Sequence, residues 1–234
     1  MMLCKWENLP EEMKVKEVYK YYCILNNKKT ELLFKRTFDI VVSLIMLIVL
    51  SPVFLVLAIA IKTDSKGPVF YRQIRVTQYG RKYRIHKFRS MIQEADKGLQ
   101  VTINNDTRIT RVGRFIRKYR LDEICQLIDI LDGAMTFVGT RPEVPKYVEQ
   151  YTPEMLATLL LPAGVTSRAS IFYRDESRLL ATAEDADKTY VESILPEKMY
   201  YNLKDIENFS FWTDIKIIFM TVFAVLGKEY QEDF

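Results

Sequence analysis

Two adjacent carboxylates, Asp122 and Glu123, are the residues of this sequence best suited to chemistry. Cleaving a pyrophosphate requires positive groups that absorb developing charge, commonly with a divalent cation held by carboxylates, and a nucleophile in line with the bond that breaks. An ionised carboxylate can act as that nucleophile without a general base. The pair alone is weak evidence, because acidic residues at a helix start also interact favourably with the helix dipole.

Basic side chains that could bind phosphates occur on both sides of this pair, at Lys87, Arg89, Arg108, Arg111, Arg114, Arg117 and Arg141. Arginine favours bidentate contacts with phosphate oxygens. Although the chain has a net charge of only +4, residues 62–120 contain sixteen Lys or Arg against four Asp or Glu. Such a block attracts the phosphates of lipids, nucleotides or nucleic acid, and a solvated basic surface is the alternative interpretation.

The composition excludes several other kinds of site. The 234 residues suffice for one compact domain with attachments. Cys4, Cys23 and Cys125 are far apart, which argues against a disulfide framework or a thiolate metal site and favours a reducing compartment. The single histidine, His86, cannot build a zinc site or a Ser-His-Asp arrangement without partners that the sequence lacks. We therefore expect His86 to be structural or to face a substrate.

A long apolar segment runs from Ile40 to Ile61 without a charged residue. At about 1.5 Å per residue, a helix of this length can cross a hydrocarbon core of roughly 30 Å. Ser51-Pro52 lies at its midpoint, where proline removes a backbone hydrogen bond and bends a helix. Both flanks are basic, and the positive-inside tendency favours the cytoplasmic side for both. The segment is therefore predicted to enter the membrane and return; a kinked transmembrane helix and a buried core helix are the alternatives.

Local patterns predict the remaining elements. They are a helix over residues 10–25, short strands after Gly67-Pro68 and over residues 83–88, a helix over residues 114–131, mixed helix and turns over residues 142–171, and a helix over residues 209–226. Asp122 and Glu123 are expected on the helix over residues 114–131 or at its start. The last helix is uncharged only over residues 217–226, too short to span a membrane and suited to its interface.

Taken in order, several short motifs resemble those of the bacterial sugar transferases called monotopic polyprenyl-phosphate phosphoglycosyl transferases. The motifs are Lys35-Arg36-Thr37-Phe38-Asp39, Ser51-Pro52, Ile61-Lys62 to Gly67-Pro68-Val69-Phe70, Lys87-Phe88-Arg89-Ser90-Met91, Ile109-Thr110-Arg111-Val112-Gly113, Leu121-Asp122-Glu123 and Gly139-Thr140-Arg141-Pro142-Glu143. The resemblance covers about residues 34–228. Because the chain is short and no large multi-helix membrane region precedes Lys35, it resembles the small form of that family.

The resemblance implies an α/β fold. It comprises a small, mostly helical cytoplasmic catalytic domain with short strands, anchored by a re-entrant membrane helix broken at Ser51-Pro52 and by interfacial amphipathic helices. The implied divisions are an N-terminal helical extension (1–33), the re-entrant membrane helix (34–62), the catalytic domain (63–208) and a C-terminal interfacial helix and tail (209–234). The expected location is the bacterial inner membrane, with the catalytic domain on the cytoplasmic face.

The resemblance also implies a reaction. In family members the Asp of the LDE motif attacks the β-phosphate of a UDP-sugar, UMP leaves, and polyprenyl phosphate takes the sugar phosphate from the carboxylate, which initiates the assembly of a lipid-linked glycan. Asp122 matches this nucleophile, and Glu123 matches the neighbour associated with Mg²⁺. The predicted substrate-binding residues are Lys87, Arg89, Arg108, Arg111, Arg117, Arg141, Pro142 and Arg174. The expected partners are a UDP-sugar, polyprenyl phosphate, the lipid bilayer and downstream glycosyltransferases, with no nucleic acid.

Departures from the family pattern at Cys125, Ala134, Thr140 and His86 leave the donor sugar open. A basic membrane-surface adaptor without activity is the main alternative, and it should tolerate Asp122→Asn. A nucleic-acid binder fits the basic block but not the apolar segment. An ordinary glycosyltransferase would release UDP in place of UMP.

Overall fold

The computed structural model describes residues 3–92, 108–174, 176, 180, 185–228 and 230. Residues 93–107 of the predicted basic block therefore lie outside the described residues. The helices among the described residues are α1 (Lys16–Asn26), α2 (Lys29–Asp64), α3 (Arg111–Lys118), α4 (Gln126–Leu131), α5 (Pro145–Val148), α6 (Arg168–Phe172), α8 (Ala186–Thr189), α9 (Leu195–Glu207) and α10 (Phe211–Val225). The strands are β1 (Phe70–Val76), β2 (Lys82–Phe88), β3 (Met135–Val138) and β4 (Ala163–Thr166). Short helical turns are η1 (Trp6–Asn8), η2 (Glu11–Met13), η3 (Gln78–Gly80), η5 (Leu121–Glu123), η6 (Met155–Leu160) and η7 (Tyr190–Ile194).

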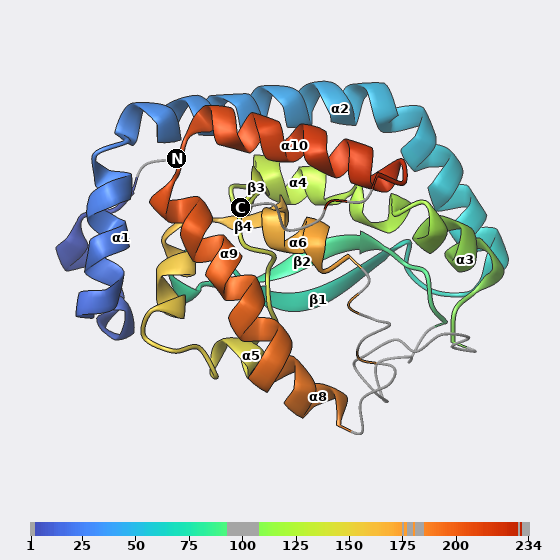
Figure 1. Ribbon diagram of the computed structural model, residues 1–234. Coiled ribbons are helices and arrows are strands. Elements are labelled where there is room, and N and C mark those ends of the chain that lie inside the picture. Colours follow the sequence, from blue (N-terminus) through green and yellow to red (C-terminus); the bar gives the residue numbers. More distant parts are fainter. Residues whose placement is uncertain are drawn as a thin grey trace.

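Helices dominate the structure, and the four strands form two small sheets. β1 and β2 pair antiparallel, with Phe70 opposite Phe88, whereas β3 and β4 pair parallel. Figure 1 shows α2 along the top of the molecule with α10 beside it, and α9 running obliquely below them. This arrangement confirms the predicted mostly helical fold with short strands.

Helix α2 remains continuous through Pro52. Proline lacks the N–H that would bind the carbonyl four residues earlier, which here belongs to Ile48. The Ser51 hydroxyl donates to that same Ile48 carbonyl at 2.8 Å, so the acceptor is satisfied. Figure 1 shows the helix running along the top and then turning down towards α3. The predicted break at Ser51-Pro52 is therefore wrong, because the helix continues through Pro52.

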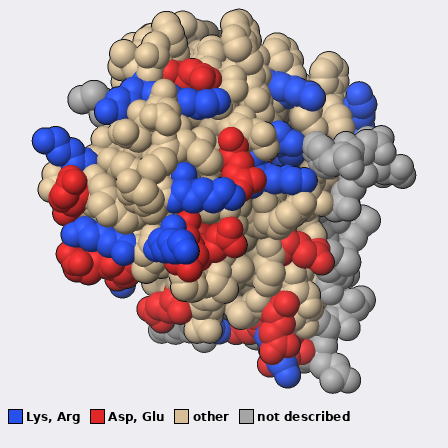
Figure 2. Space-filling model, turned by 60° about the vertical axis from the view of Figure 1, so that its left-hand side comes forward, with Lys and Arg blue, Asp and Glu red and all other residues tan. Residues whose placement is uncertain are grey.

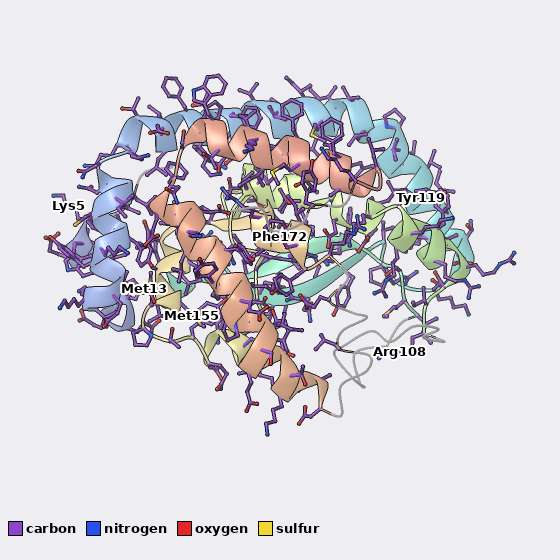
Figure 3. The ribbon with its side chains drawn as sticks, in the orientation of Figure 1. Lys5, Met13, Arg108, Tyr119, Met155 and Phe172 are labelled. Carbon is purple, nitrogen blue, oxygen red and sulfur yellow. The ribbon has the colours of Figure 1, made fainter. Side chains whose placement is uncertain are left out.

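Helix α2 is long and apolar enough to cross a membrane, and only 11% of its most apolar stretch is buried. Ile48, Val49 and Val56 are each about two-thirds exposed. The sticks of Figure 3 project outward along the upper edge of α2, and the top edge of the face in Figure 2 is mostly uncharged. Trp212 of α10 and Leu226 directly after it are each 76% exposed. The chain thus carries exposed apolar faces that suit a membrane anchor.

Both ends of α2 are attached to the rest of the protein. Near its start, the buried Lys35 ammonium lies 2.5 Å from Asp214 of α10 and donates to the Val138 carbonyl of β3 at 2.7 Å. Asp39 accepts a hydrogen bond from the Thr136 hydroxyl at 2.7 Å. Because these polar groups are buried, each needs its partner there.

At the other end, Leu57 and Ile61 are buried in a cluster with Phe88 and Ile116. Asp64, the last residue of the helix, accepts a hydrogen bond from the Val112 amide in the first turn of α3 at 2.9 Å. The two ends of α2 therefore contact one folded body, although the middle of the helix is exposed.

The N-terminal extension belongs to the main hydrophobic core. Met13, Val18 and Leu25 are buried together with Leu160 and Phe209. The predicted helix over residues 10–25 is divided into η2 and α1, because the intervening Val15 has extended backbone angles.

Candidate active site

Asp122 and Glu123 lie in η5, a single helical turn between α3 and α4. The sequence predicted one helix over residues 114–131, and this is wrong because Arg120 has a left-handed conformation with φ of 53°. That conformation ends α3 and redirects the chain before the carboxylates. Both acidic side chains are half-buried. The turn therefore presents two carboxylates at the junction of two helices.

Two basic residues from distant parts of the chain hold Glu123. The Lys87 ammonium of β2 lies 3.1 Å from Glu123 Oε1, and Arg141 donates from both terminal nitrogens to the two carboxylate oxygens. Burial alone would raise the pKa of Glu123, but the charges of Arg141 and Lys87 outweigh burial and hold that pKa well below its usual range. Glu123 is therefore ionised at neutral pH.

Asp122 experiences the opposite environment. Burial, followed by the neighbouring Glu123 charge, raises the pKa of Asp122, and Lys87 and Arg117 oppose the rise only in part. Among the residues that the structure describes, no other side chain is hydrogen-bonded to the Asp122 carboxylate. A poorly solvated and unengaged carboxylate is suited to nucleophilic attack.

The structure therefore brings together five of the predicted site residues: Lys87, Arg117, Asp122, Glu123 and Arg141. Two glycines make this arrangement possible for Arg141. A β-carbon on Gly164 of β4 would lie 2.1 Å from the carbonyl oxygen of Gly139, so the strand can approach the segment that precedes Arg141 only without a side chain there.

Arg89 and Arg174 bind backbone elsewhere. Arg89 is 5% exposed and donates to the carbonyls of Ser65 and Lys66, just after α2, at 2.7 Å each. Arg174 donates to the Ala224 carbonyl in the last turn of α10 at 3.0 Å. These contacts fix helix ends, and a role for either residue in substrate binding stays a prediction.

The remaining predicted binding residues are Arg108, Arg111 and Pro142. Arg111 is exposed in the first turn of α3, and the Arg108 carbonyl accepts a hydrogen bond from the Ile92 amide at 2.9 Å. Pro142 is buried, and its carbonyl accepts a hydrogen bond from Arg75 at 3.1 Å. The substrate-binding roles of Arg108, Arg111 and Pro142 stay predictions.

A role for Glu123 in binding Mg²⁺ stays a prediction, and a carboxylate is the type of ligand that this ion takes. Mg²⁺ prefers carboxylate oxygens, keeps several water molecules and shares its remaining positions with substrate phosphates. No cluster of three or more His, Cys, Asp or Glu side chains suited to a metal occurs within the described parts of the chain. Glu123 offers one carboxylate of this kind, and its lowered pKa keeps it in the ionised form.

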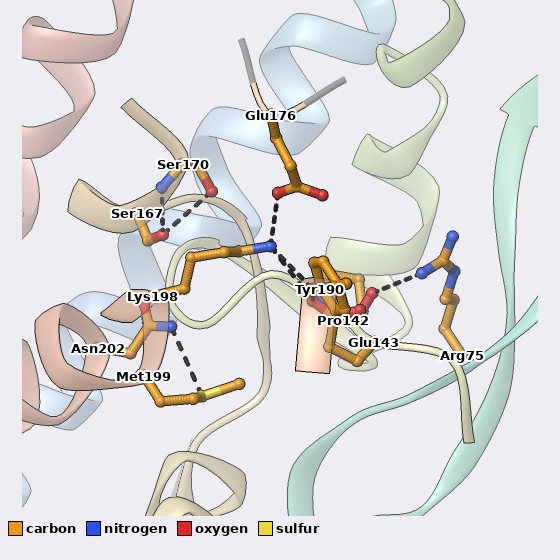
Figure 4. A network of polar contacts seen from close by, with 10 residues as sticks. All are labelled: Arg75, Pro142, Glu143, Ser167, Ser170, Glu176, Tyr190, Lys198, Met199 and Asn202. Carbon is orange, nitrogen blue, oxygen red and sulfur yellow. Dashed lines mark hydrogen bonds and ion pairs between the residues drawn. The ribbon is translucent and has the colours of Figure 1, made fainter. Parts of the chain in front are cut away.

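Two polar groups near the site have partners that the sequence did not indicate. His86 binds Asp129 of α4 twice, through its amide at 2.8 Å and through Nδ1 at 2.7 Å, which docks β2 on α4 next to Lys87. The expectation of a structural His86 fits these contacts. Glu143, two residues after Arg141, belongs to a buried network with Lys198 and Tyr190 (Figure 4). Glu143, the residue after Pro142, was the only local signal for that network.

Comparison with known proteins gives the family. A model of the bacterial sugar transferase family matches residues 30–228. The chain is 40% identical over 198 residues to the UDP-glucose:undecaprenyl-phosphate glucose-1-phosphate transferase of Klebsiella pneumoniae, a match that covers 82% of this chain and 40% of that protein. It is 36% identical over 196 residues to the UDP-N-acetylgalactosamine-undecaprenyl-phosphate N-acetylgalactosaminephosphotransferase of Aeromonas hydrophila, covering 82% of this chain and 43% of the relative.

The undecaprenyl-phosphate galactose phosphotransferase of Salmonella typhimurium is 33% identical over 224 residues, covering 88% of this chain and 44% of that protein. The chain thus spans less than half the length of these curated relatives. The family match begins at residue 30, at the start of α2, and includes every residue of the site described above. This chain belongs to the bacterial sugar transferase family.

Proposed function

We propose that this chain moves a sugar 1-phosphate from a UDP-sugar to polyprenyl phosphate and releases UMP. The names of its relatives describe transfers of a sugar phosphate to undecaprenyl phosphate. The observation that carries the proposal is the contrast within η5, where a poorly solvated Asp122 lies beside a Glu123 held ionised by Lys87 and Arg141. This contrast supports a proposal in which Asp122 attacks and Glu123 organises charge.

The reaction has two balanced steps. First, a carboxylate oxygen of Asp122 forms a bond to the β-phosphorus, and the bond from that phosphorus to the oxygen shared with the α-phosphate breaks, so that UMP leaves with the electron pair. Second, a phosphate oxygen of the polyprenyl phosphate attacks the same phosphorus, and the bond to Asp122 breaks. The carboxylate is regenerated, and no general base is required.

Positive groups are already in place for the charge that develops on the phosphates. Lys87, Arg117 and Arg141 surround the carboxylates, and Arg141 can present two N–H groups to one phosphate. Glu123 would hold Mg²⁺, which would neutralise charge on the phosphate oxygens when bound. Water exclusion by burial strengthens each of these interactions.

We further propose that α2 enters the membrane and returns to the same side. The support is that Lys35 and Asp39 at one end and Leu57, Ile61 and Asp64 at the other contact one folded body. The apolar middle of α2 and the exposed face of α10 would then lie in the bilayer. Basic flanks favour the cytoplasmic face of the inner membrane.

In this position the product would be a lipid-linked sugar diphosphate at the membrane surface. Such a product is an acceptor for enzymes that extend a glycan, so we propose that the chain acts at the start of a polysaccharide pathway and supplies downstream glycosyltransferases. The sugars named for its relatives include glucose, galactose and N-acetylgalactosamine, which makes their UDP derivatives the first donors to test.

The intermediate provides the decisive test. Purified protein is incubated with Mg²⁺ and each UDP-sugar, without polyprenyl phosphate, and examined by intact and peptide mass spectrometry. We expect up to one UMP per protein and the added mass of one sugar phosphate on the peptide that contains Asp122. Asp122→Asn should abolish the adduct and reduce turnover by at least about 10³-fold, as expected for loss of a nucleophile.

Asp132→Asn is the matched control, because Asp132 is an exposed acidic residue at the end of α4. It should retain the adduct. If Asp122→Asn keeps near-normal turnover and the parent gives no adduct on a donor that it consumes, the nucleophile assignment is wrong. If the parent protein turns over none of the UDP-sugars, the result favours the membrane-adaptor alternative.

A further inference from the structure

Strand β2 packs against the carboxylate turn η5 and helix α4 through two apolar and two polar residues. Ile85 is buried in a cluster with apolar residues of α4, and Phe88 is buried in a cluster with Cys125, which directly precedes α4. The polar residues His86 and Lys87 lie between these two. Apolar packing therefore fixes this part of β2 at both ends, and polar contacts fix its middle.

His86 uses both oxygens of the Asp129 carboxylate. The His86 amide donates to Oδ2 at 2.8 Å, and ring Nδ1 lies 2.7 Å from Oδ1. Asp129 is 2% exposed, so its carboxylate depends on His86 where water is largely excluded. These two hydrogen bonds form the His86–Asp129 clasp, which joins β2 to α4.

Arg72 of β1 determines which ring nitrogen of His86 carries the proton. Arg72 lies opposite His86 in the two-stranded sheet, and its Nη1 contacts ring Nε2. A guanidinium group only donates hydrogen bonds, so Nε2 is the acceptor and the ring proton is on Nδ1, from which it is donated to Asp129. Arg72 also donates from Nε and Nη2 to the Arg84 carbonyl, at 3.2 Å and 2.9 Å, which holds the guanidinium in place.

The clasp lies one residue from a contact of the candidate active site. His86 is followed by Lys87, whose ammonium lies 3.1 Å from Glu123 Oε1. Only two residues separate the end of η5 from the start of α4. Two neighbouring residues of β2 therefore hold two points of one short segment, at Glu123 and at Asp129.

We propose that His86 and Asp129 are positioning residues, whose clasp sets the approach of Lys87 to Glu123 in the carboxylate turn. Arg72 contributes because it keeps the imidazole in the form that donates to Asp129. The inference rests on the proposed function, since its purpose is to place a cation beside the phosphates while the aspartyl adduct forms. A displacement of about 1 Å can slow a reaction by about 10²-fold, so a contact one residue from Lys87 affects the rate strongly.

Three substitutions at His86 separate its two side-chain hydrogen bonds. His86→Phe keeps a ring but loses both of them. His86→Asn places an amide N–H near the position of Nδ1, so it retains a donor to Asp129. His86→Gln places an amide oxygen near the position of Nε2, so it retains only an acceptor for Arg72.

Each variant is mixed with Mg²⁺ and a UDP-sugar that the parent consumes, without polyprenyl phosphate, and UMP release is followed through a single turnover. We expect His86→Phe and His86→Gln to lower the rate constant by roughly 10- to 100-fold and His86→Asn to stay within about 3-fold of the parent. The amplitude should match the parent in all three. A merely structural role would instead lower the amplitude, because fewer molecules would be folded, and would leave the rate constant unchanged.

Two further variants test whether the clasp acts through Lys87. In a Lys87→Met background, His86→Phe should cause little further loss of rate, because the contact that the clasp positions is already absent. Lys82→Met is the matched control, since it removes an exposed cation from the same strand. It should keep the rate constant of the parent.

Unfolding of the same variants in denaturant needs no substrate. If the clasp sets the contact between Lys87 and Glu123, the losses of stability from His86→Phe and Lys87→Met should be smaller together than their sum, because the two changes remove a shared interaction. Independent contacts would give losses that add.

A lower rate constant at full amplitude, recovery in His86→Asn and non-additive losses of stability support the clasp. A lower amplitude with an unchanged rate constant, equal rate constants in His86→Asn and His86→Phe, or additive losses in the double variant overturn it. If the parent forms no adduct with any donor, the proposed function fails, and the unfolding measurements alone then decide whether the clasp holds Lys87 to Glu123.

Discussion

Asp122 and Glu123 are adjacent in one helical turn, but their surroundings shift their pKa values in opposite directions. Burial and the Glu123 charge raise the pKa of Asp122, so the ionised form of Asp122 is disfavoured in the folded state. Arg141 and Lys87 hold the pKa of Glu123 below its usual range despite burial. Divergent environments for two neighbouring acids are typical of a site in which each has its own role.

These shifts predict opposite effects on stability at neutral pH. Asp122→Asn should raise the melting temperature at pH 7, because it removes a poorly solvated charge. The gain should disappear as the pH falls below about 4, where Asp122 is protonated in both the folded and the unfolded chain. Melting curves of the parent and the variant between pH 3 and pH 8 test this. A variant less stable than the parent at pH 7 would contradict it.

Glu123→Gln should instead destabilise the protein by about 1–3 kcal/mol at pH 7, because Lys87 and Arg141 lose a charged acceptor. A lowered pKa contributes stability above the unfolded-state value, and this contribution is lost as the pH falls through the folded-state value. The difference between the parent and this variant should therefore shrink below about pH 4. The same pH series measures it.

At the scale of elements, Pro52 lies inside α2, and the Ser51 hydroxyl donates to the Ile48 carbonyl that the proline leaves without a backbone donor. Pro52→Ala restores a backbone donor to that carbonyl, so the helix can straighten. Single cysteines at positions 30 and 66 report the topology. In the parent, both should react with an impermeant thiol reagent from the same side of the membrane.

In Pro52→Ala, a fraction of the molecules should expose the two positions on opposite sides, because a straight helix of this length can span the bilayer. Ser51→Ala is the comparison, since it removes the hydroxyl but keeps the proline bend. Labelling from opposite faces in the parent would overturn the re-entrant proposal. An unchanged topology in Pro52→Ala would show that the end contacts of α2, and not Pro52, determine the topology.

Elements with a strong local pattern were predictable from the sequence, and elements set by single backbone angles were not. The apolar run predicted α2, and the aromatic and aliphatic run over residues 209–226 predicted α10. Arg120 divides the expected helix over residues 114–131, although arginine is not a residue type that indicates a left-handed conformation. Strands β3 and β4, each of four residues, are too short to show a reliable alternating pattern.

Within the site, the motif around Leu121-Asp122-Glu123 located the carboxylates, and the resemblance supplied Arg141. The partners of the nearby Glu143 were not predictable, because Tyr190 and Lys198 follow Glu143 by 47 and 55 residues. Local spacing contains no information on such tertiary pairs. The same limit explains Arg89, whose basic character suggested phosphate binding but whose guanidinium binds carbonyls after α2.

For the molecule as a whole, the pair between Lys35 and Asp214 joins the long apolar helix α2 to α10 and, through the Val138 carbonyl, to β3. Lys35 is 2% exposed and Asp214 is 9% exposed. Lys35→Met would leave a buried carboxylate without its cation. We expect a loss of about 3–5 kcal/mol, as is typical when one partner of a buried ion pair is removed.

Denaturant unfolding in detergent measures this loss. Lys146→Met, which disrupts an exposed ion pair, is the matched control and should cost less than about 1 kcal/mol. The double variant Lys35→Met/Asp214→Leu should recover part of the loss, because no buried charge is left unpaired. Equal stability of Lys35→Met and Lys146→Met would show that the Lys35 pair does not hold α2 in place.

The positions of Lys35 and Asp214 in the sequence also determine when the pair can form during synthesis of the chain. Lys35 and Asp214 are 179 residues apart, and a ribosome that adds roughly 5–20 residues per second produces Asp214 roughly 10–35 seconds after Lys35. The Val138 carbonyl, 103 residues after Lys35, is made earlier and offers a neutral acceptor in the meantime. The apolar helix is thus complete and able to enter the lipid long before its ionic partner exists. Docking of α10 is then the last step, and a nascent chain halted before residue 214 should be associated with the membrane but remain incompletely folded.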